Sequence, residues 1–159
     1  MFRFRAAWVA ASMKILVAVD SSNEAHEIAV VAKALFPAAD HLIVSAVSPA
    51  SYMVSDPIAG GMIPFVTSAD AFAASQEQSE VAVKAAKAVL GDEATVQVDP
   101  GAPGQVICDY AKAADVDVIV VGRRAKGWLS HLFDPSVSEY VIRHAPCPVL
   151  VVREAEPVS

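Results

Sequence analysis

The chain has 159 residues, of which 55% are hydrophobic and 19% are charged, and its formal net charge at pH 7 is -6. This length suits a single domain, and the composition argues against intrinsic disorder. The negative charge also argues against nucleic-acid partners, because binding to phosphates requires clustered Lys and Arg.

The two cysteines, Cys108 and Cys147, are too few for a disulfide scaffold and fit no zinc pattern. No stretch reaches the roughly 20 apolar residues that a membrane helix needs. The chain's start resembles a secretory signal only faintly, because its apolar patch is short and Lys14 interrupts it. We therefore expect a cytoplasmic protein with no membrane partner and no bound metal.

The domain is expected to span residues 13–153. Residues 1–12 precede a second methionine, Met13, and have no place in the strand pattern that follows. We expect them to form an N-terminal extension, which is not native if translation starts at Met13. Residues 154–159 are expected to form a short tail.

The first half of the chain predicts two buried strands around a helix. Residues 15–19 form a β-branched apolar run that ends at Asp20. Residues 21–24 read as a capping box for a helix that Pro37 terminates, and a second strand is expected at 42–47. Residues 48–67 hold three prolines and a Gly-Gly pair, which indicates a long loop. That loop either covers the end of the sheet or acts as a ligand lid or partner surface.

The second half continues the alternation. A long helix is expected at about 68–90, followed by an edge strand at 94–98 and by another helix after the turn at 101–104. A very hydrophobic strand is expected at 116–121 and ends at Gly122. A helix at 134–144 and a last strand at 148–152 complete the pattern. The inner stripe of that last helix is predicted to comprise Val137, Tyr140, Val141 and His144.

Five strands alternating with four helices predict an α/β domain with three layers around an open parallel sheet. Ligands of such sheets bind at the carboxyl ends of the strands, where the strand order reverses. Asp20 either receives hydrogen bonds from a ribose or base, or caps the first helix. The segment 122–136 has a glycine, basic residues and a serine before a helix, which is typical either of a phosphate site or of an ordinary solvated loop.

Three segments, at 13–22, 101–122 and 136–152, carry a resemblance to the universal stress protein family, which covers residues 13–153. The resemblance implies a five-stranded parallel sheet of order 3-2-1-4-5, of the adenine-nucleotide alpha-hydrolase-like kind. It also implies a nucleotide site for ATP or another adenine nucleotide. The residues that it assigns to this site are Ala18, Val19, Asp20, Ala46, Val121, Gly122, Arg123, Arg124, Ser136, Val137 and Ser138.

The nucleotide loop departs from the family pattern of glycines. Gly122 and Ser136 match, but Ala125 and Pro135 replace the second and third glycines. The methyl group of Ala125 hinders close approach of phosphate, and Pro135 lacks an N–H donor. We therefore expect a regulatory or binding module with weak or lost nucleotide binding, without catalytic residues, that acts through an unknown protein partner. The alternative is an ATP-binding member that hydrolyses ATP slowly.

The last strand also predicts how the chain assembles. Val149, Leu150, Val151 and Val152 form an apolar run that the family's strand order places at the sheet edge. Exposed apolar edges favour pairing with another strand. We expect a homodimer through these four residues, a mode that the resemblance also implies.

Overall fold

The computed structural model describes residues 12–19, 24–47, 68–123 and 137–153. Nine elements follow one another: β1 (Lys14–Ala18), α1 (Glu24–Leu35), β2 (Asp40–Val47), α2 (Ser68–Leu90), β3 (Thr95–Pro100), α3 (Pro103–Ala114), β4 (Val118–Arg123), α4 (Val137–His144) and β5 (Val149–Arg153). All observed strand pairs are parallel, and the strand order is β3-β2-β1-β4-β5, which confirms the predicted sheet.

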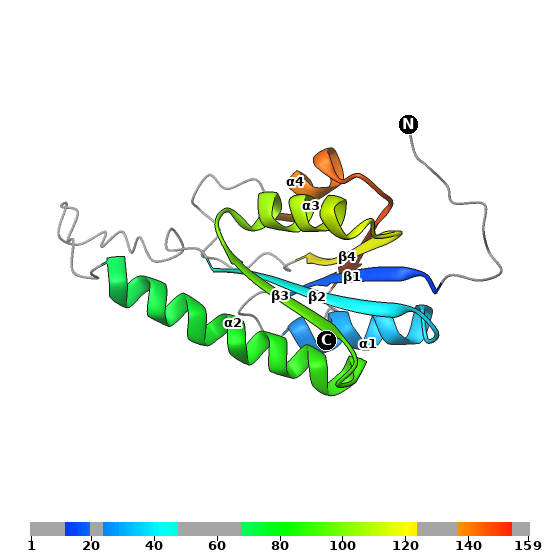
Figure 1. Ribbon diagram of the computed structural model, residues 1–159, viewed down its shortest axis with the longest axis horizontal. Helices are drawn as coiled ribbons and strands as arrows, with labels where there is room; N and C mark the ends of the chain where they lie inside the picture. The colour runs from blue at the N-terminus through cyan, green and yellow to red at the C-terminus, as the bar shows by residue number, and fades with distance from the viewer. Residues whose placement is uncertain (1–11, 20–23, 48–67, 124–136, 154–159) are drawn as a thin grey trace, which may run out of the picture.

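Two helices cover each face of the sheet (Figure 1). One core cluster joins Ile15, Val17 and Ile43 to α1 and α2. The other joins Leu16 and Val44 to α3 and α4. Neighbouring residues of β1 thus face opposite cores, which is why this strand reads as a continuous apolar run rather than an alternating one.

The observed β4 differs from the prediction at both ends. Val116 is not yet in the strand, because its N–H donates to the carbonyl of Ala111 and completes the end of α3. This ending is left-handed, with Asp115 at φ 53°. At the other end β4 does not stop at Gly122, since Arg123 continues the ladder beside Arg153 of β5.

The amino ends of β1 and β4 are fastened together. The N–H of Lys14 donates to Asp117 Oδ2 at 2.9 Å, and the N–H of Asp117 donates to the carbonyl of Lys14 at 2.9 Å. The ammonium of Lys14 also donates to the carbonyl of Ala114 at the end of α3, at 3.0 Å. A positive charge at the carbonyl end of a helix is stabilising, because it interacts favourably with the helix dipole.

A glycine sets the contact between α3 and α4. A Cβ at Gly104 would lie 2.5 Å from Tyr140 Cδ1 and 2.8 Å from Tyr140 Cγ. Gly104 therefore allows the ring of Tyr140 to pack directly on the first turn of α3.

We predict that Gly104→Ala lowers the free energy of unfolding by about 1–3 kcal/mol, because the added methyl group overpacks this contact. Urea unfolding monitored by circular dichroism measures the change. Gln105→Ala, at the exposed neighbouring position, is the control. Tyr140→Leu should restore much of the loss when combined with Gly104→Ala, and a fully additive double variant would contradict the proposed contact.

His41 is a buried titratable group at the start of β2. Its side chain is 6% exposed, and among the described residues its Nε2 atom has no hydrogen-bond partner. Burial, reinforced by the positive charge of Lys33, lowers the pKa of His41 below the ordinary histidine value of 6.5. The unfolded chain therefore binds this proton more readily than the folded one.

We predict that His41 makes the protein less stable as the pH falls below about 6.5, since protonation favours the state with the higher pKa. His41→Phe should flatten the dependence of the free energy of unfolding on pH between about pH 7 and about pH 5. His26→Gln, at an exposed histidine of α1, is the matched control. Equal slopes in the wild-type chain and His41→Phe would contradict this role.

Candidate functional site

The chain's strand order reverses between β1 and β4. β1 leads to α1 on one face of the sheet, whereas β4 is followed by α4 on the opposite face. In open parallel sheets the connections diverge at such a point and leave a crevice at the carboxyl ends of the two strands. The candidate site is therefore the end of the β1–β4 pair, on the left of the sheet in Figure 1.

Four of the predicted site residues come together at this end. β1 and β4 pair up to Val17 and Val120, so Ala18 and Val19 end one strand beside Val121 and Gly122 on the other. The N–H of Val19 donates to the carbonyl of Val44 at 2.9 Å, which keeps the chain paired with β2 just past β1. The strand ends are therefore held by the sheet before the chain leaves it.

The two sides of the sheet offer different surfaces at this end. Ala18 and Val121 belong to the core cluster beneath α3 and α4, while Val19 belongs to the cluster beneath α1 and α2. Ala46, two residues beyond the partner of Ala18, shares the α3 side with it. Ala18 and Ala46 are thus short side chains at the carboxyl end of the sheet, on the side of α3 and α4.

The start of α4 differs from the sequence prediction. Val137 is 39% exposed and His144 is exposed, so neither belongs to the inner stripe, whereas Ser138 and Val141 are buried. Ser138 is 5% exposed and already interacts within the protein. Tyr140 and Val141 pack against the core as predicted, and Ser138 is buried at the start of the helix in place of Val137.

Three predicted site residues, Asp20, Arg124 and Ser136, lie outside the described residues, as does most of the nucleotide loop. Arg123 is placed only by its backbone, at the end of β4. The structure therefore describes the base of the candidate site and not the loops above it. The loop at 48–67 also lies outside.

The thiols are unsuited to nucleophilic chemistry. Burial raises the pKa of Cys108, and it raises the pKa of Cys147 to about 11. Both cysteines are free, buried and hence protonated at neutral pH. His144 instead interacts with Tyr140. Its Nδ1 atom lies 2.8 Å from the backbone carbonyl oxygen of Tyr140, and the two rings stack with their centroids 4.1 Å apart.

The described ranges contain no group of three or more His, Cys, Asp or Glu residues arranged to hold a metal ion. Nor is any helix in them long and apolar enough to cross a membrane.

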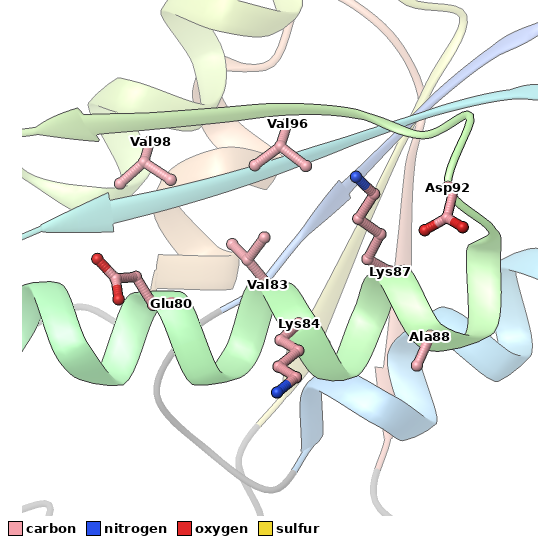
Figure 2. A pocket seen from close by; sticks show the side chains of 8 residues that line it. All are labelled: Glu80, Val83, Lys84, Lys87, Ala88, Asp92, Val96 and Val98. Carbon is pink, nitrogen blue, oxygen red and sulfur yellow. The ribbon is translucent and has the colours of Figure 1, made fainter.

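Two open grooves that the sequence analysis missed flank β3. One, of about 540 Å³, lies between α2 and β3 (Figure 2). The other, of about 440 Å³, lies between the end of β3 and α3 and is lined by Asp99, Asp109 and Tyr110 among others. Burial and the charge of Asp99 raise the pKa of Tyr110. The alternation of polar and apolar residues in β3 was the available signal, but it did not show which helix residues would face the strand.

The sequence comparisons agree with this architecture. The model of the universal stress protein family matches residues 12–153. A universal stress protein of Thermus aquaticus is 34% identical over 145 residues, covering 87% of this chain and 97% of that protein. Two universal stress proteins of Synechocystis sp. are each 48% identical to this chain over a short stretch. In one, the match spans 56 residues, which is 35% of this chain and 36% of that protein. In the other, it spans 52 residues, which is 33% of this chain and 48% of that protein.

Solved structures share the fold. Universal stress protein UspA from Lactobacillus plantarum has a TM-score of 0.63 and 25% identity, covering 91% of this chain and 100% of that chain. The universal stress protein from Archaeoglobus fulgidus, solved in complex with dAMP, has a TM-score of 0.52 and 23% identity, covering 87% and 96%. Another universal stress protein, in complex with cAMP, has a TM-score of 0.55 and 21% identity, covering 92% and 100%.

The strand order and the reversal between β1 and β4 define an α/β domain of the adenine-nucleotide alpha-hydrolase-like class. Within that class, this chain belongs to the universal stress protein family.

Proposed function

We propose that this protein is a cytoplasmic stress-response module that binds an adenine nucleotide weakly in the β1–β4 crevice and acts through a protein partner. The observation that carries the proposal is the strand reversal, which brings the carboxyl ends of β1 and β4 side by side, with Ala18, Ala46 and Gly122 as small residues at this end of the sheet. The dAMP and cAMP complexes of relatives with this fold support an adenine nucleotide as the ligand.

Weak binding follows from the loop sequence. A phosphate site needs backbone N–H groups and room for close approach. Ala125 adds a methyl group, Pro135 removes a donor, and Asp134 adds a negative charge near the start of α4. The adenosine part of a ligand is less affected, because the base of the crevice is formed by the strand ends rather than by this loop.

We predict that calorimetry of the purified protein detects no tight binding of Mg-ATP. The triple variant Ala125→Gly, Asp134→Gly, Pro135→Gly should bind it more strongly, because it restores the backbone that phosphate requires. GTP titrations of both proteins control for nonspecific binding of anions.

A low-micromolar dissociation constant for Mg-ATP in the wild-type chain would contradict weak binding and favour the ATP-binding alternative. Extraction of small molecules from the freshly purified protein provides an independent check. If neither dAMP, cAMP nor ATP binds at any concentration tested, in the wild-type chain or in the triple variant, the nucleotide proposal is wrong.

We further propose a homodimer through β5. In the described part of the chain, β5 pairs on one side with β4 and lies at the sheet edge on the other. The N–H of Ile119 donates to the carbonyl of Pro148 at 3.0 Å. Backbone N–H and C=O groups alternate in direction along a strand. Those of Leu150 therefore point toward β4, and those of Val151 point away from the sheet. Two outward-facing apolar strands related by a twofold axis can pair antiparallel.

We predict that Val151→Pro converts the dimer to a folded monomer, because proline removes an N–H that faces the partner and is tolerated at strand edges. Leu150→Pro is the contrasting variant and should unfold the domain by removing an N–H that faces β4. Val151→Lys should also dissociate the dimer or unfold the chain, since Val151 packs against the core beneath α3 and α4. Light scattering and circular dichroism distinguish these outcomes, and a monomeric wild-type protein at micromolar concentration would refute the dimer.

A further inference from the structure

β3 forms the opposite edge of the sheet, as far as the structure describes the chain. The N–H of Gly101, directly after β3, donates to the carbonyl of Val47 on β2 at 3.1 Å. Because backbone groups alternate along a strand, the odd-numbered residues of β3 also point toward β2. The N–H and C=O groups of Val96 and Val98 therefore point away from the sheet, ready to pair with another strand.

This edge is less suited than β5 to pairing with a copy of itself. Pro100, the third outward position, has no N–H, and Gln97 and Asp99 interrupt the apolar residues. Such features protect edge strands from indiscriminate pairing. A strand that adds here must be short and must complement the different surfaces on the two sides of β3.

The groove on the α2 side is apolar at its base. Val83 of α2 points toward Val96 and Val98 of β3, as Figure 2 shows. Val98 is 39% exposed, so burying it against another side chain would remove apolar surface from water. Lys84 and Lys87 line the same groove. Ammonium groups there can also interact favourably with the faces of aromatic rings.

The groove on the α3 side is acidic. Asp99 and Asp109 line it together with the phenol ring of Tyr110. Gln97 Nε2 donates to Asp99 Oδ1 at 2.7 Å, which orients that carboxylate beside the strand. Carboxylates in this arrangement can accept paired hydrogen bonds from arginine.

A complementary strand thus carries apolar side chains at every second position and basic ones between them. The chain contains one such run near its N-terminus, where Phe2, Arg3, Phe4 and Arg5 alternate. Alternation of this kind is the pattern of a strand with two different faces.

We propose that residues 2–5 add to β3 of the same chain as a sixth, antiparallel strand. Residues directly opposite each other in an antiparallel pair lie on the same face. Phe4 then lies opposite Val96 and Phe2 opposite Val98, so that both rings cover the α2-side groove. Arg3 lies opposite Gln97 and diagonal to Asp99, at the acidic groove on the other side, and Arg5 lies on the same face as Arg3. This gives a role in the sheet to a segment that sequence patterns left outside the domain.

The chain is long enough to make this connection. Met13 is fixed at the amino edge of the sheet, where its carbonyl accepts a hydrogen bond from the N–H of Asp40 at 2.7 Å. The path from β1 to the outer side of β3 crosses three strand spacings, about 14 Å in all. Residues 6–12 reach up to about 25 Å when extended. Because they must return to the amino edge, the added strand runs antiparallel to β3.

Amide hydrogen exchange of the full-length protein, followed by NMR, tests the proposal. We expect the amides of Val96 and Val98 to exchange about tenfold or more slowly than in the double variant Arg3→Glu, Arg5→Glu, in which repulsion by the acidic groove releases the strand. The control Arg3→Lys, Arg5→Lys keeps both charges and should retain most of the protection. Combining Arg3→Glu and Arg5→Glu with Asp99→Lys and Asp109→Lys should restore it.

Equal exchange rates for Val96 and Val98 in the wild-type chain and the Arg3→Glu, Arg5→Glu variant would overturn the proposal. Loss of protection on dilution would overturn it as well, because it would show that a second copy supplies the strand. Neither result bears on nucleotide binding or on pairing through β5, which are measured separately.

Discussion

The burial of β1 on both faces and along both edges is the constraint on which the rest of the structure depends. Ile15, Leu16 and Val17 are fully buried, and their strand pairs with β2 on one side and β4 on the other. Consecutive side chains of β1 pack alternately into two separate cores, one beneath each pair of helices. β1 thus holds both helical layers to one sheet and fixes the point where the strand order reverses.

The sequence was sufficient to predict the sheet because each buried strand is a short apolar run between clear helix signals. It predicted less well where backbone hydrogen bonds decide the boundary, as at Val116, which completes α3, and at Arg123, which stays paired with β5. The face of α4 was also predicted imperfectly: Ser138 is polar, yet it is buried, while Val137 is exposed. In an eight-residue helix, a few contacts with neighbouring elements outweigh the hydrophobic pattern.

In the candidate site, too, some features could be predicted from the sequence and others could not. Its base could be predicted, since Ala18, Val19, Val121 and Gly122 lie at or near the carboxyl ends of adjacent strands and the sheet order brings these ends together. Their roles toward a ligand remain predictions, as does the loop that carries Arg124 and Ser136. The grooves beside β3 could not be predicted, because they depend on which residues of α2 and α3 face the edge strand.

The fastening of Lys14 to Asp117 and Ala114 has a mechanical consequence. It closes the β1–β4 pair at the end opposite the crevice, so these strands cannot separate along their whole length without breaking several hydrogen bonds. Because these hydrogen bonds hold the amino ends, the carboxyl ends of β1 and β4 can move apart more readily than the amino ends. The helices α1 and α4, which follow these carboxyl ends on opposite faces of the sheet, would then be displaced more than the strands' amino ends.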